Sequence, residues 1–222
     1  MAAELRLVDP PETLWRVELA ARSLDFAHIN AVDAAGAGGN RFDVPGAGVL
    51  YAATAPVGSF AETLARFRPS ADLLLKMKDF PDDGLGLPGD VDSSWRSRRR
   101  LKSMRLVEPL KFVDVDHPAT HTFLTEHAAS ELLGAGVTNL DVAILRSADR
   151  RITRAIAAWI YSNVDEHDRS LYSGIRYTSR LGDYECWAIF DGTEVEIGEE
   201  LRLDDGHPDL DIVAQTFGLH FS

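Results

Sequence analysis

The sequence predicts a single α+β domain, in which strands and helices are mixed along the chain. Short apolar or alternating runs bounded by turn residues indicate strands, as at Leu14–Leu19 and Val49–Tyr51. Apolar residues three and four positions apart indicate helices, and the clearest stripe lies in 151–163. With 222 residues, 45% of them hydrophobic, the chain is long enough to bury one sizeable core.

The densest group of chemically active residues lies in the turn–strand–helix unit Asn40–Phe67. A short apolar strand is its middle part, and we expect Ser59 to open its helix. This order places Arg41 and Tyr51 at one end of a sheet. Glu62 then falls on the first turn of the helix behind that sheet.

A second positioned arginine precedes this unit. Alternation in the strand Leu14–Leu19 puts Arg16 on the face opposite Trp15 and Val17. Residues 33–39 are small and rich in glycine, but they lack the Gly-Lys-Ser/Thr ending of a phosphate-binding loop. We interpret them as a flexible lead into the arginine that follows.

The same patterns predict the remaining elements. Ala71–Met77 fits either helix or strand, and Pro81–Asp90 is a loop by its turn residues. We expect strands at Lys111–Val115, Gly174–Ser179, Cys186–Phe190 and Val195–Leu201, and helices at Ala119–Leu133, Arg151–Asn163 and Ile212–Phe217. The domain should then have a core at about 14–190, with an acidic extension, 191–222, packed on it.

One basic segment, Ser93–Arg105, stands out in an acidic chain of net charge -12. We expect a helix here, with Trp95 and Leu101 facing inward. It is either a phosphate or nucleic-acid contact or a solvated helix face, and we favour the latter because aromatic interleaving is limited to one tryptophan. The negative net charge also argues against a general nucleic-acid surface.

Composition also sets an expected location. No apolar run approaches the length needed to cross a bilayer, and the first residues lack the pattern of a signal peptide. The single Cys186 cannot form an intrachain disulfide, which suits a reducing compartment. We therefore expect a cytoplasmic protein without membrane contact, in which Cys186 is a packed small hydrophobic residue rather than a nucleophile.

Two histidines, His117 and His121, are four residues apart, a spacing that can place two imidazoles on one metal in a helix. However, Pro118 is expected to start the helix, His127 falls on another face, and no HExxH pattern is present. We interpret them as surface histidines and expect no metal site and no cofactor.

Several segments, in this order, resemble the RES-domain family, which is named for its arginine, glutamate and serine. They are an arginine in a first strand, then GNRFDVPGAGVLYAA, FAETL, and GIRYTSR followed by CWAIF. The resemblance covers about Leu14 to Phe190. It implies a fold of the ADP-ribosyltransferase type, with a split β-sheet core, surrounding helices and a cleft for NAD. Many members are toxins that destroy cellular NAD and are neutralised by an Xre-type antitoxin.

The resemblance also implies site residues. The family arginine after a glycine pair falls on Arg41, the tyrosine on Tyr51, the glutamate on Glu62 and the serine on Ser179, while Arg16 matches the first-strand arginine. The usual Gly-Gly-Arg-Trp reads Gly-Asn-Arg-Phe in this chain, and a non-glycine residue restricts the backbone at that point.

These residue types suit cleavage of NAD. Breaking the bond between nicotinamide and ribose builds positive charge on the ribose, which the carboxylate of Glu62 would stabilise. Arg41 and Arg16 would hold the two phosphates. Tyr51 would offer an aromatic face to nicotinamide, and Ser179 a hydroxyl to the carboxamide or the ribose.

Other interpretations stay open. The acceptor can be water, phosphate or a protein side chain, which gives a glycohydrolase, a phosphorylase or a mono-ADP-ribosyltransferase. A non-catalytic nucleotide-binding or interaction domain is the alternative from another class. Ser59 and Glu62 also form an S-x-x-E pattern, which is typical of a helix capping box. The expected partners are NAD as substrate, an Xre-type antitoxin and, as an open alternative, a second copy in a homodimer.

Overall fold

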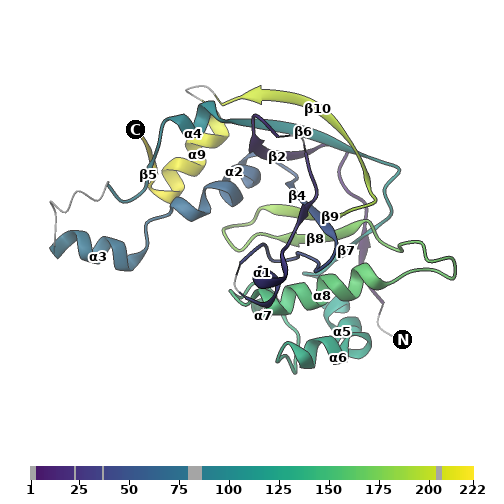
Figure 1. Cartoon of the computed structure of the whole chain (residues 1–222). Helices are drawn as coiled ribbons and strands as arrows, with labels where there is room; N and C mark the ends of the chain where they lie inside the picture. Colours follow the sequence, from purple (N-terminus) through teal and green to yellow (C-terminus); the bar gives the residue numbers. More distant parts are fainter. Residues whose placement is uncertain (1–3, 23, 37, 80–86, 204–206) are drawn as a thin grey trace.

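The computed structural model describes residues 4–22, 24–36, 38–79, 87–203 and 207–222. It shows a mixed sheet with helices packed around it, so the predicted α+β fold is confirmed (Figure 1). Residues 81–86, most of the predicted loop Pro81–Asp90, lie outside the described part of the chain.

Nine strands form one bent sheet in the described residues. They are β1 (Leu7–Val8), β2 (Leu14–Leu19), β3 (Ala27–His28), β4 (Gly48–Ala53), β6 (Arg99–Val107), β7 (Phe112–Asp114), β8 (Gly174–Thr178), β9 (Glu185–Phe190) and β10 (Glu194–Arg202). The order is β1-β7-β8-β9-β4-β2-β6-β10, with β3 also paired to β4. β7 and β8 run parallel, and the other neighbours run antiparallel. Two further short strands, β5 (Asp90–Val91) and β11 (His220–Phe221), pair with each other.

The helices form two groups on either side of the sheet's centre (Figure 1). They are α1 (Ala31–Ala35), α2 (Pro56–Leu64), the 3-10 turn η1 (Ala65–Phe67), α3 (Ala71–Asp79), α4 (Ser94–Ser97), α5 (Pro118–His127), α6 (Ala129–Gly134), α7 (Val142–Leu145), α8 (Arg150–Ser162) and α9 (Pro208–Phe217). In Figure 1, α5 to α8 lie below the strands β7, β8 and β9, whereas α2, α4 and α9 lie at the upper left.

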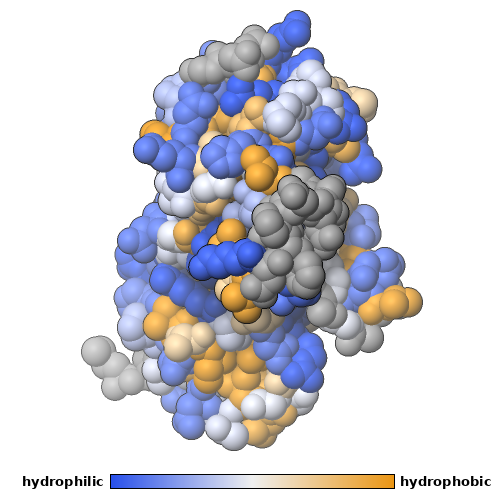
Figure 2. Space-filling view, turned by 90° about the vertical axis from the view of Figure 1, so that its left-hand side faces the viewer, coloured by the Kyte–Doolittle hydropathy of each residue, from blue (hydrophilic) through white to orange (hydrophobic). Residues whose placement is uncertain are grey.

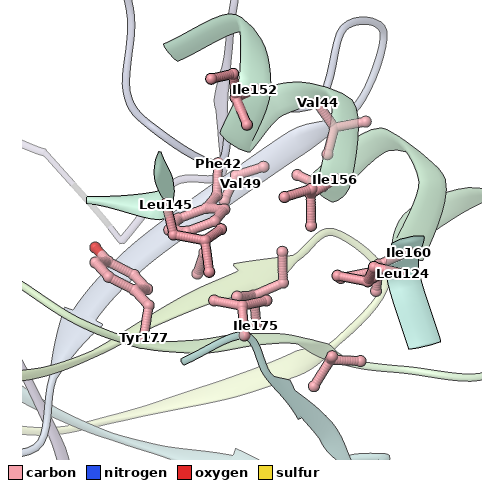
Figure 3. Packing of buried hydrophobic residues seen from close by; sticks show 14 of the residues in the cluster. Phe42, Val44, Val49, Leu124, Leu145, Ile152, Ile156, Ile160, Ile175 and Tyr177 are labelled. Atoms are coloured by element: carbon pink, nitrogen blue, oxygen red, sulfur yellow. The ribbon is translucent and has the colours of Figure 1, made fainter. Parts of the chain in front are cut away.

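Each helix group covers its own hydrophobic core. On one face of the sheet, the stripe Ile152, Ile156 and Ile160 of α8 packs towards Ile175 and Phe42 (Figure 3). The predicted role of this stripe as core is therefore confirmed. A second cluster joins α2 and α9 to β2 and β6; its fully or largely buried members include Val17, Phe60, Leu64, Leu101, Leu210, Val213 and Phe217. Tyr184 packs against both clusters, so the two cores meet near the β8–β9 turn.

The sheet is nearly split between β2 and β4. One register pair, Trp15 with Ala53, joins the two strands, while six pairs join β2 to β6 and five join β4 to β9. In this register Val17 would face Tyr51 next. Instead, the Val17 N–H donates to Ser59 Oγ at 2.7 Å, and Arg16 donates to the Tyr51 carbonyl at 2.7 Å. Side chains thus satisfy the backbone groups that the split leaves without ladder partners.

Replacing Ser59 with alanine should destabilise the protein, since the buried Val17 N–H would lose its acceptor. An unsatisfied buried donor costs about 1–3 kcal/mol, and we expect the free energy of unfolding in urea to fall by that amount. Ser130→Ala, on the exposed face of α6, is the matched control and should change it by less than about 0.5 kcal/mol. Equal stability of the two variants would contradict this role of Ser59.

The basic segment differs from its predicted form. The helix expected over Ser93–Arg105 is limited to α4, and Arg99 to Val107 form strand β6. The reason is tertiary, because β6 pairs with the acidic strand β10, which brings Glu196 to Arg105 and Glu200 to within 3.2 Å of Lys102. Acidic residues of β10 thus pair with Arg100, Lys102 and Arg105, whereas Arg96 and Arg98 pair with Asp211 and Asp92 outside the sheet.

Most other elements match their predictions. Ala71–Met77 is part of the helix α3, and the helix expected at Ala119–Leu133 is interrupted at Ala128 to give α5 and α6. The acidic tail is integral to the domain, since β10 is a strand of the main sheet and Leu210 of α9 is buried in the second core.

Polarity varies across the face that lies on the left in Figure 1. In Figure 2, hydrophilic residues line the left side of this face at mid-height, and apolar ones gather at its lower end, where Figure 1 places α5 to α7. In that region Leu133 is 63% exposed and Val142 is 43% exposed.

Among the helices that the structure describes, none combines the length and the apolar character required to pass through a bilayer.

Candidate active site

A cavity of about 880 Å³ opens beside the split in the sheet. Four of the predicted site residues, Arg16, Arg41, Tyr51 and Glu62, line it. The fifth, Ser179, is 2% exposed and contacts Glu62 from behind. The structure therefore brings all five together, although 163 positions separate the first and the last along the sequence (179 − 16).

The cavity is strongly basic in a protein of net charge -12. The arginines among its described lining residues are Arg16, Arg41, Arg66, Arg68, Arg150 and Arg180, and the acidic residue among them is Glu62. Such a local concentration of guanidinium groups attracts an anionic ligand that the overall charge would repel. Arginine also suits phosphate better than lysine does, because its planar fork makes two parallel hydrogen bonds.

Arg41 is held at the cavity wall by both polar and aromatic contacts. Its guanidinium donates to the Leu145 carbonyl at 2.7 Å, and it lies 5.1 Å from the ring centre of Phe42 and 5.2 Å from that of Tyr177. Burial lowers the pKa of Arg41 from its usual value, and the negative charge of Glu62 is among the groups that oppose this shift. The side chain is thus a preorganised cation in the cavity wall.

Glu62 is exposed to the cavity and oriented by Ser179. The Ser179 hydroxyl donates a hydrogen bond to Glu62 Oε1 at 2.6 Å and accepts one from the Leu181 N–H at 3.0 Å. This serine, expected to contact the ribose or the carboxamide, thereby has its one donor directed at the carboxylate. The second oxygen of Glu62 is available to face a ligand.

The helix that carries Glu62 begins earlier than predicted. α2 starts at Pro56 with Ala55 as its N-cap, so Ser59 does not open it and Glu62 lies on its second turn. Proline at the first helical position explains this start, because its missing N–H needs no partner there. The hydroxyl of Ser59 accepts from Val17 instead, which rules out the capping-box alternative for Glu62.

Tyr51 and Arg16 each have structural partners as well. The Tyr51 hydroxyl donates to the buried Asp43 at 2.9 Å and accepts from the Phe42 N–H at 3.0 Å, which leaves its ring at the cavity. Arg16 donates to Glu18 at 2.9 Å in addition to the Tyr51 carbonyl. Both residues shape the wall of the cavity while presenting part of their surface to it.

Tyr177 is a cavity residue that sequence analysis did not single out. It lies on β8 and packs its ring against Phe42 at 4.7 Å (Figure 3), and it lines the same cavity as Arg41. Side chains two residues apart in a strand share a face, so the predicted site residue Ser179 was a signal for Tyr177. Arg180, which also lines the cavity, is exposed at the end of the same strand.

Burial keeps three ionisable side chains neutral, namely Tyr51 and Tyr177 in the cavity wall and Cys186, which contacts Tyr177. Burial is the main cause that raises the pKa of the Tyr51 and Tyr177 phenols and of the Cys186 thiol above their usual values of 10.0 and 9.0. The prediction that Cys186 is a packed residue is confirmed, since it is 1% exposed. A thiol kept in its neutral form is a poor nucleophile.

These shifts predict a loss of stability in alkali. A group whose pKa is raised on folding contributes stability below its unfolded pKa and loses it as the pH rises towards its folded pKa. We therefore expect the urea midpoint to fall as the pH rises from about 8 to about 11. In Cys186→Ala the part of the decline that starts near pH 9 should be absent. A midpoint that stays constant over this range would contradict the prediction.

The two histidines considered as metal ligands contact the backbone instead. His117 accepts from the Ala119 N–H at the start of α5, and His121 Nε2 lies 2.8 Å from the Val115 carbonyl. Within the described ranges no cluster of potential metal-ligating side chains is found.

Comparison with known proteins agrees with this geometry. The sequence model of the RES domain matches residues 13–211. The chain belongs to the RES family. No curated protein sequence matches it significantly. Among solved structures, the M. tuberculosis MbcT–MbcA toxin–antitoxin complex is similar, with 12% identity, a TM-score of 0.51, and coverage of 95% of this chain and 91% of the matched chain. At this identity the similarity concerns the fold.

Proposed function

We propose that this RES-family protein is an enzyme that binds NAD in the arginine-lined cavity and cleaves the bond between nicotinamide and ribose. The observation that carries the proposal is the pairing of one carboxylate, Glu62, oriented by Ser179, with a wall of arginines. A site that bound only anions would gain nothing from a carboxylate next to its ligand. Placed beside an oxocarbenium-like ribose, the same carboxylate stabilises the transition state more than the ground state.

The binding half of the proposal rests on charge and size. A cavity of about 880 Å³ is in the range of small-molecule and cofactor sites. Arg41 and Arg16 would hold the diphosphate, with Arg180 at the rim. The ring of Tyr51, or that of the neighbouring Tyr177, would provide an aromatic surface for the nicotinamide.

The chemical half is a substitution at the ribose C1′. The bond from C1′ to the nicotinamide nitrogen breaks, and its electron pair leaves with neutral nicotinamide. A water oxygen then bonds to C1′ and loses one proton, which Glu62 is placed to accept before releasing it to solvent. The products are nicotinamide, ADP-ribose and a proton. With phosphate as acceptor, the product would be an ADP-ribose phosphate.

We further propose that the protein is a toxin with an antitoxin partner. The support is membership of the RES family and similarity of fold to a toxin that was solved in complex with its antitoxin. An Xre-type partner is what the sequence resemblance implies. The simplest inhibition would place a segment of the partner in the cavity, next to Arg41.

The proposal is tested by incubating the purified protein with NAD, with and without inorganic phosphate, and separating the products by chromatography. Release of free nicotinamide supports an NAD-cleaving enzyme, and an ADP-ribose phosphate would identify phosphate as the acceptor. Binding of NAD without release, both alone and with added host-cell protein, would instead identify a non-catalytic nucleotide-binding domain. Release only when protein is added, with label transferred to that protein, would identify an ADP-ribosyltransferase.

A further inference from the structure

Arg154 is a buried cation outside the cavity. It lies on α8, and the residue is 3% exposed. In the part of the chain that the structure describes, all of its hydrogen-bond acceptors are backbone carbonyls. They belong to Asp33 at 2.9 Å, Ala34 at 3.2 Å, Gly36 at 3.1 Å, Gly38, and Asn40 at 3.3 Å.

Two neighbours on the same helix extend this grip. Arg150, Thr153 and Arg154 are spaced so that they share one face of α8. Arg150 donates to the Gly39 carbonyl, and Thr153 Oγ1 donates to the Arg41 carbonyl. The described residues between 33 and 41, expected from sequence to be a flexible lead, are therefore fastened to a helix that belongs to the main core.

Gly39 is needed for this close approach. Its φ is +67°, and a Cβ at this position would lie 2.6 Å from Asp43 Oδ2 and 3.1 Å from a terminal nitrogen of Arg154. The carboxylate of the buried Asp43 accepts hydrogen bonds from the Asn40 N–H and from the Tyr51 hydroxyl on β4. The segment is thereby fixed on one side by α8 and on the other by β4.

We infer that Arg154 is the positioning residue for Arg41: it fixes the backbone of residues 33–36 and 38–40, so that Arg41 is held at a set place in the cavity wall. This inference rests on the proposed function for its substrate, NAD. The residue touches no part of the cavity and acts through the loop. Its effect should fall on substrate binding, because Glu62 lies on α2, Ser179 directly follows β8, and the two bond to each other rather than to this loop.

Lysine cannot take over this role. The guanidinium presents five N–H donors in a planar fork and so can reach carbonyls spread over eight residues (33 to 40), whereas an ammonium has three donors at one point. Arg154→Lys keeps the buried charge but should release part of the loop. Arg151→Lys is the matched control, because Arg151 lies on the same helix but is exposed and pairs with Asp149.

The test compares steady-state kinetics of the two variants with NAD. For Arg154→Lys we expect KM to rise about tenfold with kcat within about threefold, and for Arg151→Lys no change. In the Arg41→Ala background, Arg154→Lys should change KM by less than about twofold, because the positioned group is gone. A purely structural role would lower the melting temperature and leave the KM of the folded protein unchanged, which would overturn the inference.

Two further measurements keep the outcome decisive. Should Arg154→Lys not fold, Thr153→Val, which removes one loop contact without a change in size, should raise KM about threefold, and an unchanged KM would count against the inference. Amide hydrogen exchange of residues 38–42 is a readout that does not need NAD. Faster exchange there in Arg154→Lys but not in Arg151→Lys supports the inference even if wild-type protein neither binds nor cleaves NAD. Equal exchange in both variants overturns it.

Discussion

Glu62→Gln should lower the rate of nicotinamide release by about 10²–10³-fold, the usual cost of losing one preorganised electrostatic contact to a transition state. NAD affinity should stay within about threefold, because positive charge develops on the ribose only as the bond to nicotinamide breaks, so the carboxylate stabilises mainly the transition state. Glutamine also keeps an oxygen that can accept the hydrogen bond from the Ser179 hydroxyl, so the structure around the site should be preserved. The measurement is single-turnover release of nicotinamide, together with calorimetric titration of NAD.

The control for this change is Glu131→Gln, which removes an exposed glutamate of α6 far from the cavity and should leave both quantities unchanged. Full activity of Glu62→Gln would contradict the assignment of this carboxylate as a catalytic group. A parallel loss of affinity and rate would instead mean that Glu62 acts mainly in binding.

Arg41→Ala should weaken NAD binding by about 10- to 100-fold, in keeping with about 1.5–3 kcal/mol for a hydrogen bond to a charged group. Two contacts make this arginine the strongest candidate for the diphosphate. It is fixed by the Leu145 carbonyl and it lies beside two aromatic rings that pack against each other, so little conformational entropy is lost when a ligand binds. Affinity is best measured by titration in the Glu62→Gln background, where turnover does not consume the ligand.

The matched control is Arg169→Ala, whose side chain is 73% exposed and pairs with Asp165. It changes the net charge by the same amount but should not alter affinity by more than about twofold at physiological salt. If both variants weakened binding equally, the effect would be one of overall charge rather than of a contact in the cavity.

Much of the fold could be predicted from local patterns. Strands β4, β8 and β9 and helix α8 were predicted within a few residues, because short apolar runs bounded by turn residues mark buried strands and a period of 3.6 marks the buried face of a helix. The strand β6 was predicted as a helix for a physical reason. Its basic side chains are stabilised in a sheet because they pair with acidic side chains of β10, about ninety residues later in the chain. Local sequence patterns cannot predict such a distant strand pairing.

The candidate site divides in the same way. Arg41, Tyr51 and Glu62 could be assigned because they lie in one short unit whose order resembles a family pattern. The roles of Ser59 and Arg154 could not, since each acts on backbone groups of a distant segment. A serine in a helix and an arginine on an amphipathic helix carry no local sign that they bind a strand or a loop elsewhere.

The near-split of the sheet has a mechanical consequence. Because one residue pair joins β2 to β4, turning one half of the sheet against the other stretches that pair and the side-chain bonds of Ser59 and Arg16. Shear between any of the longer neighbouring strands would break a whole row of backbone bonds. We therefore expect the sheet to deform most easily at this pair, beside the cavity. A ligand bound to both Arg16 and Arg41 would connect the two halves of the sheet and so oppose their relative rotation.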